Sequence, residues 1–278
     1  DNMRNAYYQL NNYINLSQTQ DVFYYAAKTI LENLSMIPKL SITQVAEMCF
    51  ASTATISRLI RRLNYTSYNE FKQDVIYSID ELQNDDPIHY DVEPVHDFPN
   101  VDYHLLKKEF YTNIVENLTY TQNLFKTSDI QEIVEDIDQA KNIVFLGFNF
   151  SQMVTSQLRS TLTAYKKSAI AKSSEKLQFL SLREVTKDDL IILTSITGNY
   201  FRFRPEMAAL FKKSPAKKIV ITQDLDLAKC YHADKVISVG KQNASYIGKF
   251  SVMMVYEMIE MFFEAKHKNE SRRIDYNI

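Results

Sequence analysis

An acidic, proline-containing stretch divides this chain of 278 residues into two parts. No Lys or Arg occurs from Gln73 to Leu106, and half of the six prolines fall within that stretch. From Asp80 to Asp102 the chain has eight acidic residues, which are Asp80, Glu81, Asp85, Asp86, Asp91, Glu93, Asp97 and Asp102. Clustered like charges repel, and proline interrupts helices and sheets, so we expect an extended linker over residues 81–106. We expect one domain at residues 1–80 and another at residues 107–278.

The first segment has the pattern of an all-helical domain. Ala26, Ile30 and Leu34 recur at helical spacing, and two shorter helices are expected at residues 43–49 and 52–63. Ser52 is a favourable N-cap for the later helix, and Asn64 tolerates the left-handed conformation that ends one. The apolar positions of this helix share one face: Ile56, Leu59, Ile60 and Leu63.

The opposite face of that helix has side chains suited to contacting DNA. It includes Arg58 and Arg61, and no acidic residue occurs between Thr53 and Asn69. The N-terminal residues of a recognition helix reach base edges, and arginines pair with guanine or phosphate. The plainer alternative is a solvated polar face. We favour a helix-turn-helix that contacts double-stranded DNA, with Lys72 as a further phosphate contact and with these contact residues: Ser52, Thr53, Thr55, Ser57, Arg58, Arg61 and Arg62.

The second segment alternates short apolar runs with helical stretches. This pattern predicts a doubly wound α/β domain with a five-stranded parallel sheet covered on both faces. The expected strands lie at residues 143–146, 169–171, 190–193, 219–221 and 236–239. The last expected helix, residues 246–266, is long and apolar. Part of it has to cover the sheet, and we expect it to supply an oligomer interface through Val252, Val255, Ile259, Phe262 and Phe263.

Two of the four glycines point to a ligand site in this domain. Ligands of open parallel sheets lie at the carboxyl ends of the strands where the strand order reverses, which in a flavodoxin-like order is between the first and third strands. Gly147 and Gly198 follow these two strands, each beside small hydroxyl side chains and before a helix. Helix N-termini attract phosphate, so these loops are suited to a phosphorylated ligand.

Residues 52–72, STATISRLIRRLNYTSYNEFK, closely resemble the RpiR-type bacterial regulators. The pattern of that family is Ser-x-Ala-Thr-Ile-x-Arg-Phe, then Lys-Leu-Gly-Phe, then Phe-x-Glu-Phe-Lys. The resemblance covers about residues 20–80. Asn64 stands where the family usually has glycine, and Phe50 occupies the turn between the helices, where glycine is also common.

Regulators of this type usually continue into a sugar isomerase (SIS) domain, which binds phosphosugars. The run Gly147-Phe-Asn-Phe-Ser151 resembles its Gly-x-Gly-x-Ser loop, and Ser195-Ile-Thr-Gly-Asn199 resembles its Ser-x-Ser-Gly loop. Asn149 replaces the second glycine of the first loop. The resemblance implies phosphosugar binding by Gly147, Phe148, Asn149, Ser151, Ser173, Ser174, Ser195, Thr197, Gly198 and Asn199. Arg202 and Arg204 are candidate phosphate ligands, whereas bulky side chains could fill the pocket instead: Phe148, Phe150, Tyr200 and Phe201.

Together these features predict a bacterial transcriptional regulator that senses a phosphosugar and controls sugar-metabolism genes. It would act as a homodimer or homotetramer, because such helices work in pairs on two half-sites. One alternative is a degenerate, empty second domain that serves only oligomerisation. Another is a sugar-phosphate isomerase with a base among Glu257, Glu260 and His267. We expect neither catalysis nor a metal or cofactor. Two distant cysteines and the lack of a long apolar run favour a cytoplasmic protein without a membrane segment.

Overall fold

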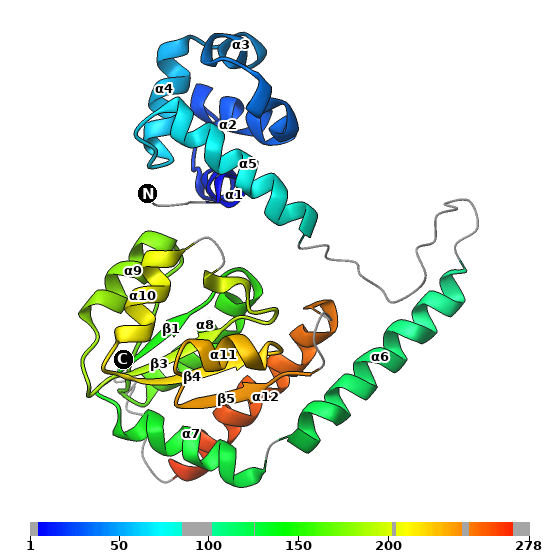
Figure 1. The fold of residues 1–278 in the computed structure, drawn as a ribbon, viewed down its shortest axis with the longest axis vertical. Helices are drawn as coiled ribbons and strands as arrows, with labels where there is room; N and C mark the ends of the chain where they lie inside the picture. The colour runs from blue at the N-terminus through cyan, green and yellow to red at the C-terminus, as the bar shows by residue number, and fades with distance from the viewer. Residues whose placement is uncertain (1–4, 85–101, 125, 202–203, 241–244, 269–278) are drawn as a thin grey trace, which may run out of the picture. The chain divides into compact units, whose positions relative to one another are not determined.

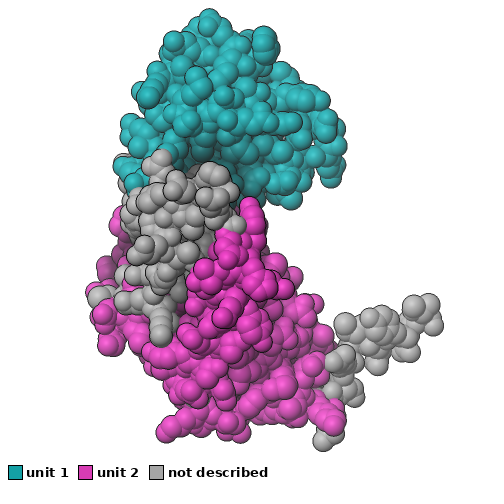
Figure 2. Space-filling view, turned by 90° about the vertical axis from the view of Figure 1, so that its right-hand side faces the viewer, with its two compact units in different colours: residues 1–86 teal, residues 87–278 magenta. Residues whose placement is uncertain are grey.

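The computed structural model describes residues 5–84, 102–124, 126–201, 204–240 and 245–268. The chain forms two compact units, residues 1–86 and residues 87–278, which Figure 2 distinguishes by colour. The first unit is helical and the second contains a sheet flanked by helices (Figure 1). The predicted fold class is therefore confirmed. Within the described residues, no helix combines the length and hydropathy that crossing a membrane requires.

The first unit is a small bundle whose helices share one core. Its elements are α1 (Ala6–Leu16), α2 (Val22–Glu32), the 3-10 helix η1 (Leu34–Lys39), α3 (Ile42–Met48), α4 (Thr53–Arg62) and α5 (Tyr68–Asn84). Ile30, Ile56, Leu59 and Phe71 are fully buried in this core. Burying such side chains is the main favourable contribution to folding, so this packing fixes how α3 and α4 are placed within the unit.

Both ends of the segment expected to be a linker are helical instead. Helix α5 continues to Asn84, since Glu81, Leu82 and Gln83 all have good helix propensity. At the other end, the Asp102 carboxylate accepts hydrogen bonds from the backbone N–H groups of His104 (2.9 Å) and Leu105 (3.1 Å), at the start of a helix. Residues 85–101, the middle of the expected linker, lie outside the described residues.

The second unit contains one all-parallel sheet of five strands. They are β1 (Asn142–Leu146), β2 (Ser168–Ala171), β3 (Leu190–Thr194), β4 (Lys217–Thr222) and β5 (Lys235–Ser238). Their order in the sheet is β2-β1-β3-β4-β5, the flavodoxin-like order expected from the sequence. In the register, Val144 lies beside Ile170 on one side and Ile191 on the other. The strand order therefore reverses between β1 and β3, and the loops that follow these two strands meet at the carboxyl edge of the sheet.

Alternate residues of each strand enter separate cores on the two faces of the sheet. Ile143 and Phe145 pack with α7 (Thr127–Gln139), α8 (Phe150–Ala164) and α12 (Ser245–Lys266). Val144 and Leu146 pack on the other face, with side chains of α9 and α10. The elements near that face are α9 (Glu175–Glu184), the 3-10 helix η2 (Asn199–Phe201), α10 (Pro205–Lys213) and α11 (Leu225–Cys230).

The expected interface on the last helix is wrong for most of its residues. Val252, Val255, Ile259 and Phe263 are fully buried against the sheet, and Phe262 packs partly against the same core. Among residues 247–266 of α12, the large apolar side chains that are exposed are Phe250, Met253 and Met261. The reason is that α12 follows the last strand and has to cover one face of the sheet with its most apolar stripe.

A buried polar network attaches helix α6 (Tyr103–Leu124) to this unit. The Asn117 side-chain amide donates to the Ser251 hydroxyl (2.7 Å) and to the Val239 carbonyl (3.3 Å). The Thr121 hydroxyl donates to the same Ser251 oxygen at 3.0 Å. Gly240 approaches so closely that a Cβ placed there would lie 2.0 Å from the Asn117 Oδ1 atom. These bonds fix α6 against α12 and the end of β5.

We predict that Asn117→Ala lowers the free energy of unfolding of the second unit by about 2 kcal/mol. The substitution leaves a buried carbonyl and a buried hydroxyl without their shared donor. Urea unfolding followed by circular dichroism measures the loss. Asn113→Ala, on the same helix at a half-buried position, is the control. A loss below about 0.5 kcal/mol for Asn117→Ala would show that the network contributes little.

Candidate nucleic-acid interface and sheet-edge site

The helices α3 and α4 begin at two well-formed caps. The Ser41 hydroxyl accepts from the Gln44 N–H at 3.3 Å, while the Gln44 side chain accepts from the Ser41 N–H at 2.8 Å. The predicted N-cap Ser52 accepts from the Thr55 N–H at 3.1 Å. Its hydroxyl also lies 2.9 Å from the Thr55 hydroxyl. The caps fix where each helix begins and so define a helix-turn-helix.

Helix α4 buries one face and exposes the other. Ile56, Leu59 and Ile60 are buried in the core of the first unit. Thr53, Ala54, Arg58 and Arg61 are exposed on the outer side, and Thr55 and Ser57 are half-buried. The predicted division of this helix into a buried apolar face and an exposed polar face is therefore confirmed. Within the described residues this surface has two arginines and no acid from α4 itself, which suits a polyanion.

Two cations that the sequence analysis expected to contact DNA, Arg62 and Lys72, make contacts within the first unit instead. The Arg62 guanidinium donates to the Tyr13 hydroxyl at 3.2 Å and lies 3.8 Å from the centroid of the Phe23 ring. It also lies 3.9 Å from the Asp21 carboxylate. The Lys72 ammonium donates to the Leu40 carbonyl at 3.0 Å. Arg62 is therefore directed toward α1 and α2, and Lys72 fixes the end of η1.

The loop after β1 is tightly packed. A Cβ on Gly147 would lie 2.7 Å from the Ser151 Cβ atom and 3.0 Å from the Thr194 carbonyl oxygen, so only glycine fits there. Asn149, at the position of the second family glycine, has a φ of 54°, which asparagine tolerates better than most residues. The backbone of the loop thus keeps a glycine-like conformation without the second glycine. Ser151 is buried at the start of α8.

Gln178 of α9, which the sequence did not indicate, connects the loops at this edge. Its side chain accepts from the Gly147 N–H (3.1 Å) and donates to the carbonyls of Gly147 (2.7 Å) and Lys172 (2.9 Å). The Tyr200 hydroxyl donates to the same Gln178 oxygen at 2.6 Å. Burial raises the pKa of Tyr200, so its phenol stays protonated and continues to donate. A single glutamine in an amphipathic helix gives no sequence signal of this role.

Four side chains pack together between the loops that follow β1 and β3. We call the space between these loops the mouth. Phe148 stacks on Tyr200 with 5.0 Å between ring centroids, and Arg204 lies 4.6 Å from the Phe148 centroid. The Arg204 Nε donates to the Glu175 carboxylate at 2.8 Å, and Nη1 donates to the Tyr200 carbonyl at 2.9 Å. We call Phe148, Glu175, Tyr200 and Arg204 the Arg204 cluster. In this structure, protein side chains fill the mouth.

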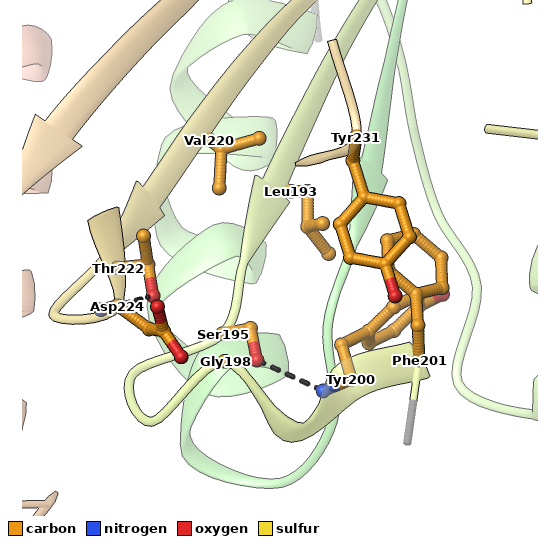
Figure 3. Close-up of a pocket in the computed structure, with 9 residues that line it drawn as sticks. All are labelled: Leu193, Ser195, Gly198, Tyr200, Phe201, Val220, Thr222, Asp224 and Tyr231. Carbon is orange, nitrogen blue, oxygen red and sulfur yellow. Dashed lines mark hydrogen bonds between the residues drawn. The ribbon is translucent and has the colours of Figure 1, made fainter. Parts of the chain in front are cut away.

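The loop after β3 is closed by its own hydrogen bonds. The Ser195 hydroxyl accepts from the Tyr200 N–H at 3.0 Å (Figure 3), and the Gly198 N–H donates to the Ser195 carbonyl at 3.1 Å. Beside the loop lies a small cavity, partly open to solvent, with room for about one water molecule. Its lining is Leu193, Ser195, Gly198, Tyr200, Phe201, Val220, Thr222, Asp224 and Tyr231 (Figure 3).

The expected ligand residues therefore separate into distinct groups. Ser195 and Gly198 line the cavity, with Thr197 and Asn199 in the same loop. Ser174 caps α9 by accepting from the Leu177 N–H at 3.3 Å, and the Ser173 carbonyl accepts from the Gln152 side chain at 2.8 Å. These two serines have local structural roles. Arg204 is paired with Glu175, and Arg202 lies outside the described residues.

The three candidate bases of an isomerase do not meet at this edge. Glu260 accepts a hydrogen bond from Thr161 of α8, and Glu257 is exposed. The His267 Nε2 lies 2.9 Å from the Asp138 carboxylate, four residues before β1 begins. This places His267 near the amino edge of the sheet, opposite the loops after β1 and β3. In these contacts Glu260 faces α8 and His267 faces Asp138, so neither of these two candidate bases is directed at the loop glycines.

The sequence and the fold are both similar to those of known regulators. No family model matches the chain. It is 21% identical to an uncharacterized HTH-type transcriptional regulator of Haemophilus influenzae over 84% of this chain and 81% of that protein. It is 26% identical to another of Providencia stuartii, over 71% of this chain and 67% of that one.

The fold comparison covers nearly the whole chain. The NanR protein of Vibrio vulnificus, solved in complex with ManNAc-6P, matches 95% of this chain and 93% of its own, with a TM-score of 0.50 and 19% identity. At that identity the likeness concerns the fold alone. The homologues of this chain are HTH-type transcriptional regulators, and its fold is similar to that of NanR.

Proposed function

We propose that this chain is a DNA-binding transcriptional regulator whose second unit senses a phosphosugar and controls genes of sugar metabolism. The observation that carries the first part is the outer face of α4, where Arg58 and Arg61 stand exposed on a capped helix. The similarity to HTH-type transcriptional regulators supports the same function.

The residues of α4 divide into base and phosphate contacts. Thr53 and Ser57 lie on the N-terminal half of the helix, the part that reaches base edges in the major groove, and Arg58 follows directly after Ser57. Arg61, in the last turn, is placed to contact phosphate. The contacts of Arg62 with Tyr13 and Phe23 favour a supporting role, in which it holds α4 against α1 and α2.

A phosphosugar effector is supported by two independent points. The structure of NanR, whose fold is similar, contains ManNAc-6P. In this chain, the loop after β3 offers hydroxyl and amide groups on Ser195, Thr197 and Asn199, and Arg204 lies at the mouth. A guanidinium binds phosphate as readily as carboxylate. We propose that the phosphate of the effector displaces Glu175 from Arg204.

The side chains that fill the mouth favour a second candidate function, in which the second unit serves oligomerisation and binds no ligand. Stacked Phe148 and Tyr200, with the Arg204–Glu175 pair, occupy the space where a ligand would enter. If this cluster never opens, the second unit serves only to hold copies of the regulator together. The two functions differ in whether phosphorylated sugars stabilise the protein.

Helix α6 supports assembly into a homodimer or larger oligomer. Buried Asn117 and Thr121 attach it to α12, yet it exposes apolar side chains around much of its circumference. These exposed residues are Tyr103, Leu105, Tyr111, Val115, Tyr120 and Leu124. A helix that is apolar on several sides is usually covered, so we propose that α6 of a second copy packs on it.

We predict that Arg58→Ala weakens binding to the operator upstream of the gene of this protein by about 10- to 100-fold, the effect of losing one bidentate base contact. Fluorescence anisotropy measures the affinity, and circular dichroism verifies the fold. Arg183→Ala, an exposed arginine of the second unit, removes the same charge and is expected to leave binding unchanged. Undiminished affinity of Arg58→Ala would contradict the assignment of α4 as the recognition helix.

We predict that Glu175→Gln tightens binding of the phosphosugar about 5- to 10-fold, because a neutral amide competes less well for Arg204. Arg204→Ala is expected to abolish binding. Thermal shifts measured against a panel of sugar phosphates report the affinity, since bound ligand stabilises the native state. Glu184→Gln, at an exposed position of the same helix, is the control. Flat curves for every variant and for the parent protein would favour the oligomerisation-only function.

We predict that the double substitution Tyr111→Glu and Val115→Glu converts the assembly to a smaller species, because it places two charges on the exposed side of α6. Light scattering coupled to gel filtration measures the mass. Leu180→Glu, at an exposed apolar position of α9, is the control for a charge placed elsewhere on the second unit. An unchanged mass at low micromolar protein would rule out α6 as the interface.

A further inference from the structure

Phe50, in the turn between α3 and α4, has an unusual conformation and an unusual exposure. Its φ is 49°, in the left-handed region that bulky side chains rarely adopt. Its side chain is 97% exposed, the largest value among the exposed apolar residues of the described chain. Neither feature is explained by the core of the first unit, because the ring packs against nothing there.

The backbone of the turn requires a left-handed residue at this position. The Ala51 N–H donates to the Ala46 carbonyl at 2.9 Å, which closes the end of α3 in the Schellman arrangement. The same arrangement ends α4, where the Tyr65 N–H donates to the Ile60 carbonyl at 3.0 Å and Asn64 takes the left-handed position. Asparagine and glycine suit that position, whereas phenylalanine is strained in it.

The two helix ends have the same backbone arrangement but different side chains in the left-handed position, phenylalanine at the end of α3 and asparagine at the end of α4. At Asn64 the side chain suits the conformation, so the local geometry alone explains the residue. At Phe50 the geometry would be better served by glycine or asparagine, and the ring gains no burial in return. Strain retained at one residue of a fold points to a function for that residue.

The neighbours of Phe50 indicate what covers its ring. Ser52, the N-cap of α4, is two residues away, so their Cα atoms are at most about 8 Å apart. Thr53 and Ala54 follow, both exposed, at the helix end that reaches base edges. The N-terminus of a helix and the nearby Arg58 both favour a polyanion on this side. Glu47, one turn earlier on α3, is the exposed acid nearest to Phe50 in the sequence.

We propose that Phe50 is a DNA-contacting residue, with its ring against apolar surface of the duplex beside the bases read by α4. Duplex DNA offers such surface at thymine methyl groups in the major groove and at the carbon atoms of deoxyribose. The proposal rests on the DNA-binding function proposed above. It adds a contact that carries no charge and that lies in the turn, outside the recognition helix.

The test uses the full-length protein and the upstream operator that the parent protein binds. Phe50→Gly is expected to weaken binding about 5- to 20-fold while raising the unfolding midpoint, because glycine removes both the ring and the strain. Phe50→Ala is expected to weaken binding to a similar degree without raising the midpoint. Asn64→Gly, at the matching helix end, is the control and is expected to leave affinity unchanged.

The salt dependence of DNA binding distinguishes the proposed apolar contact of Phe50 from an ionic contact with phosphate. The slope of log affinity against log salt is expected to be the same for Phe50→Ala and the parent protein, whereas Arg61→Ala, at the proposed phosphate contact, reduces it by about one. Parent-like affinity of both Phe50 variants would overturn the proposal, and so would a change in oligomeric mass with unchanged affinity. If the parent protein binds no DNA at all, the proposed function itself fails.

Discussion

Burial of the apolar face of α4 is the constraint on which the proposed regulatory function of this chain depends. Ile56, Leu59 and Ile60 pack into the core of the first unit, and the Ser52 cap fixes where the helix begins. Because a helix has a fixed periodicity, burying these positions determines that Arg58 and Arg61 face outward. The left-handed residues at the ends of α3 and α4 then set the length of each helix.

In the second unit, the packing of the sheet determines which residues are left at the surface. Alternate strand residues fill two cores, which leaves the loops at the carboxyl edge as the irregular surface near the strand-order reversal. Gln178 and Tyr200 connect those loops through hydrogen bonds, and the Arg204–Glu175 pair closes them. The loops are therefore held together by contacts within the protein itself, and the proposed effector phosphate would have to replace Glu175 as the partner of Arg204.

Much of the fold was predictable because it depends on local patterns. Ser52 and Asn64 predicted the ends of α4, and the apolar runs predicted all five strands. The predicted linker, residues 81–106, was too long at both ends, because α5 continues to Asn84 and Asp102 caps the start of α6. Contacts between distant residues were not predictable: Arg62 with Tyr13, Gln178 with Gly147, and Arg204 with Glu175 each join different elements. The stripe of α12 that was assigned to an interface is buried against the sheet.

The most direct test of the account is a selection of random duplex DNA by the full-length protein, followed by sequencing of the bound fraction. The account predicts enrichment of a defined sequence arranged as two half-sites, separated centre to centre by about one helical turn of DNA or a multiple of it. A folded protein that enriches no sequence would contradict the central claim that α4 reads base pairs.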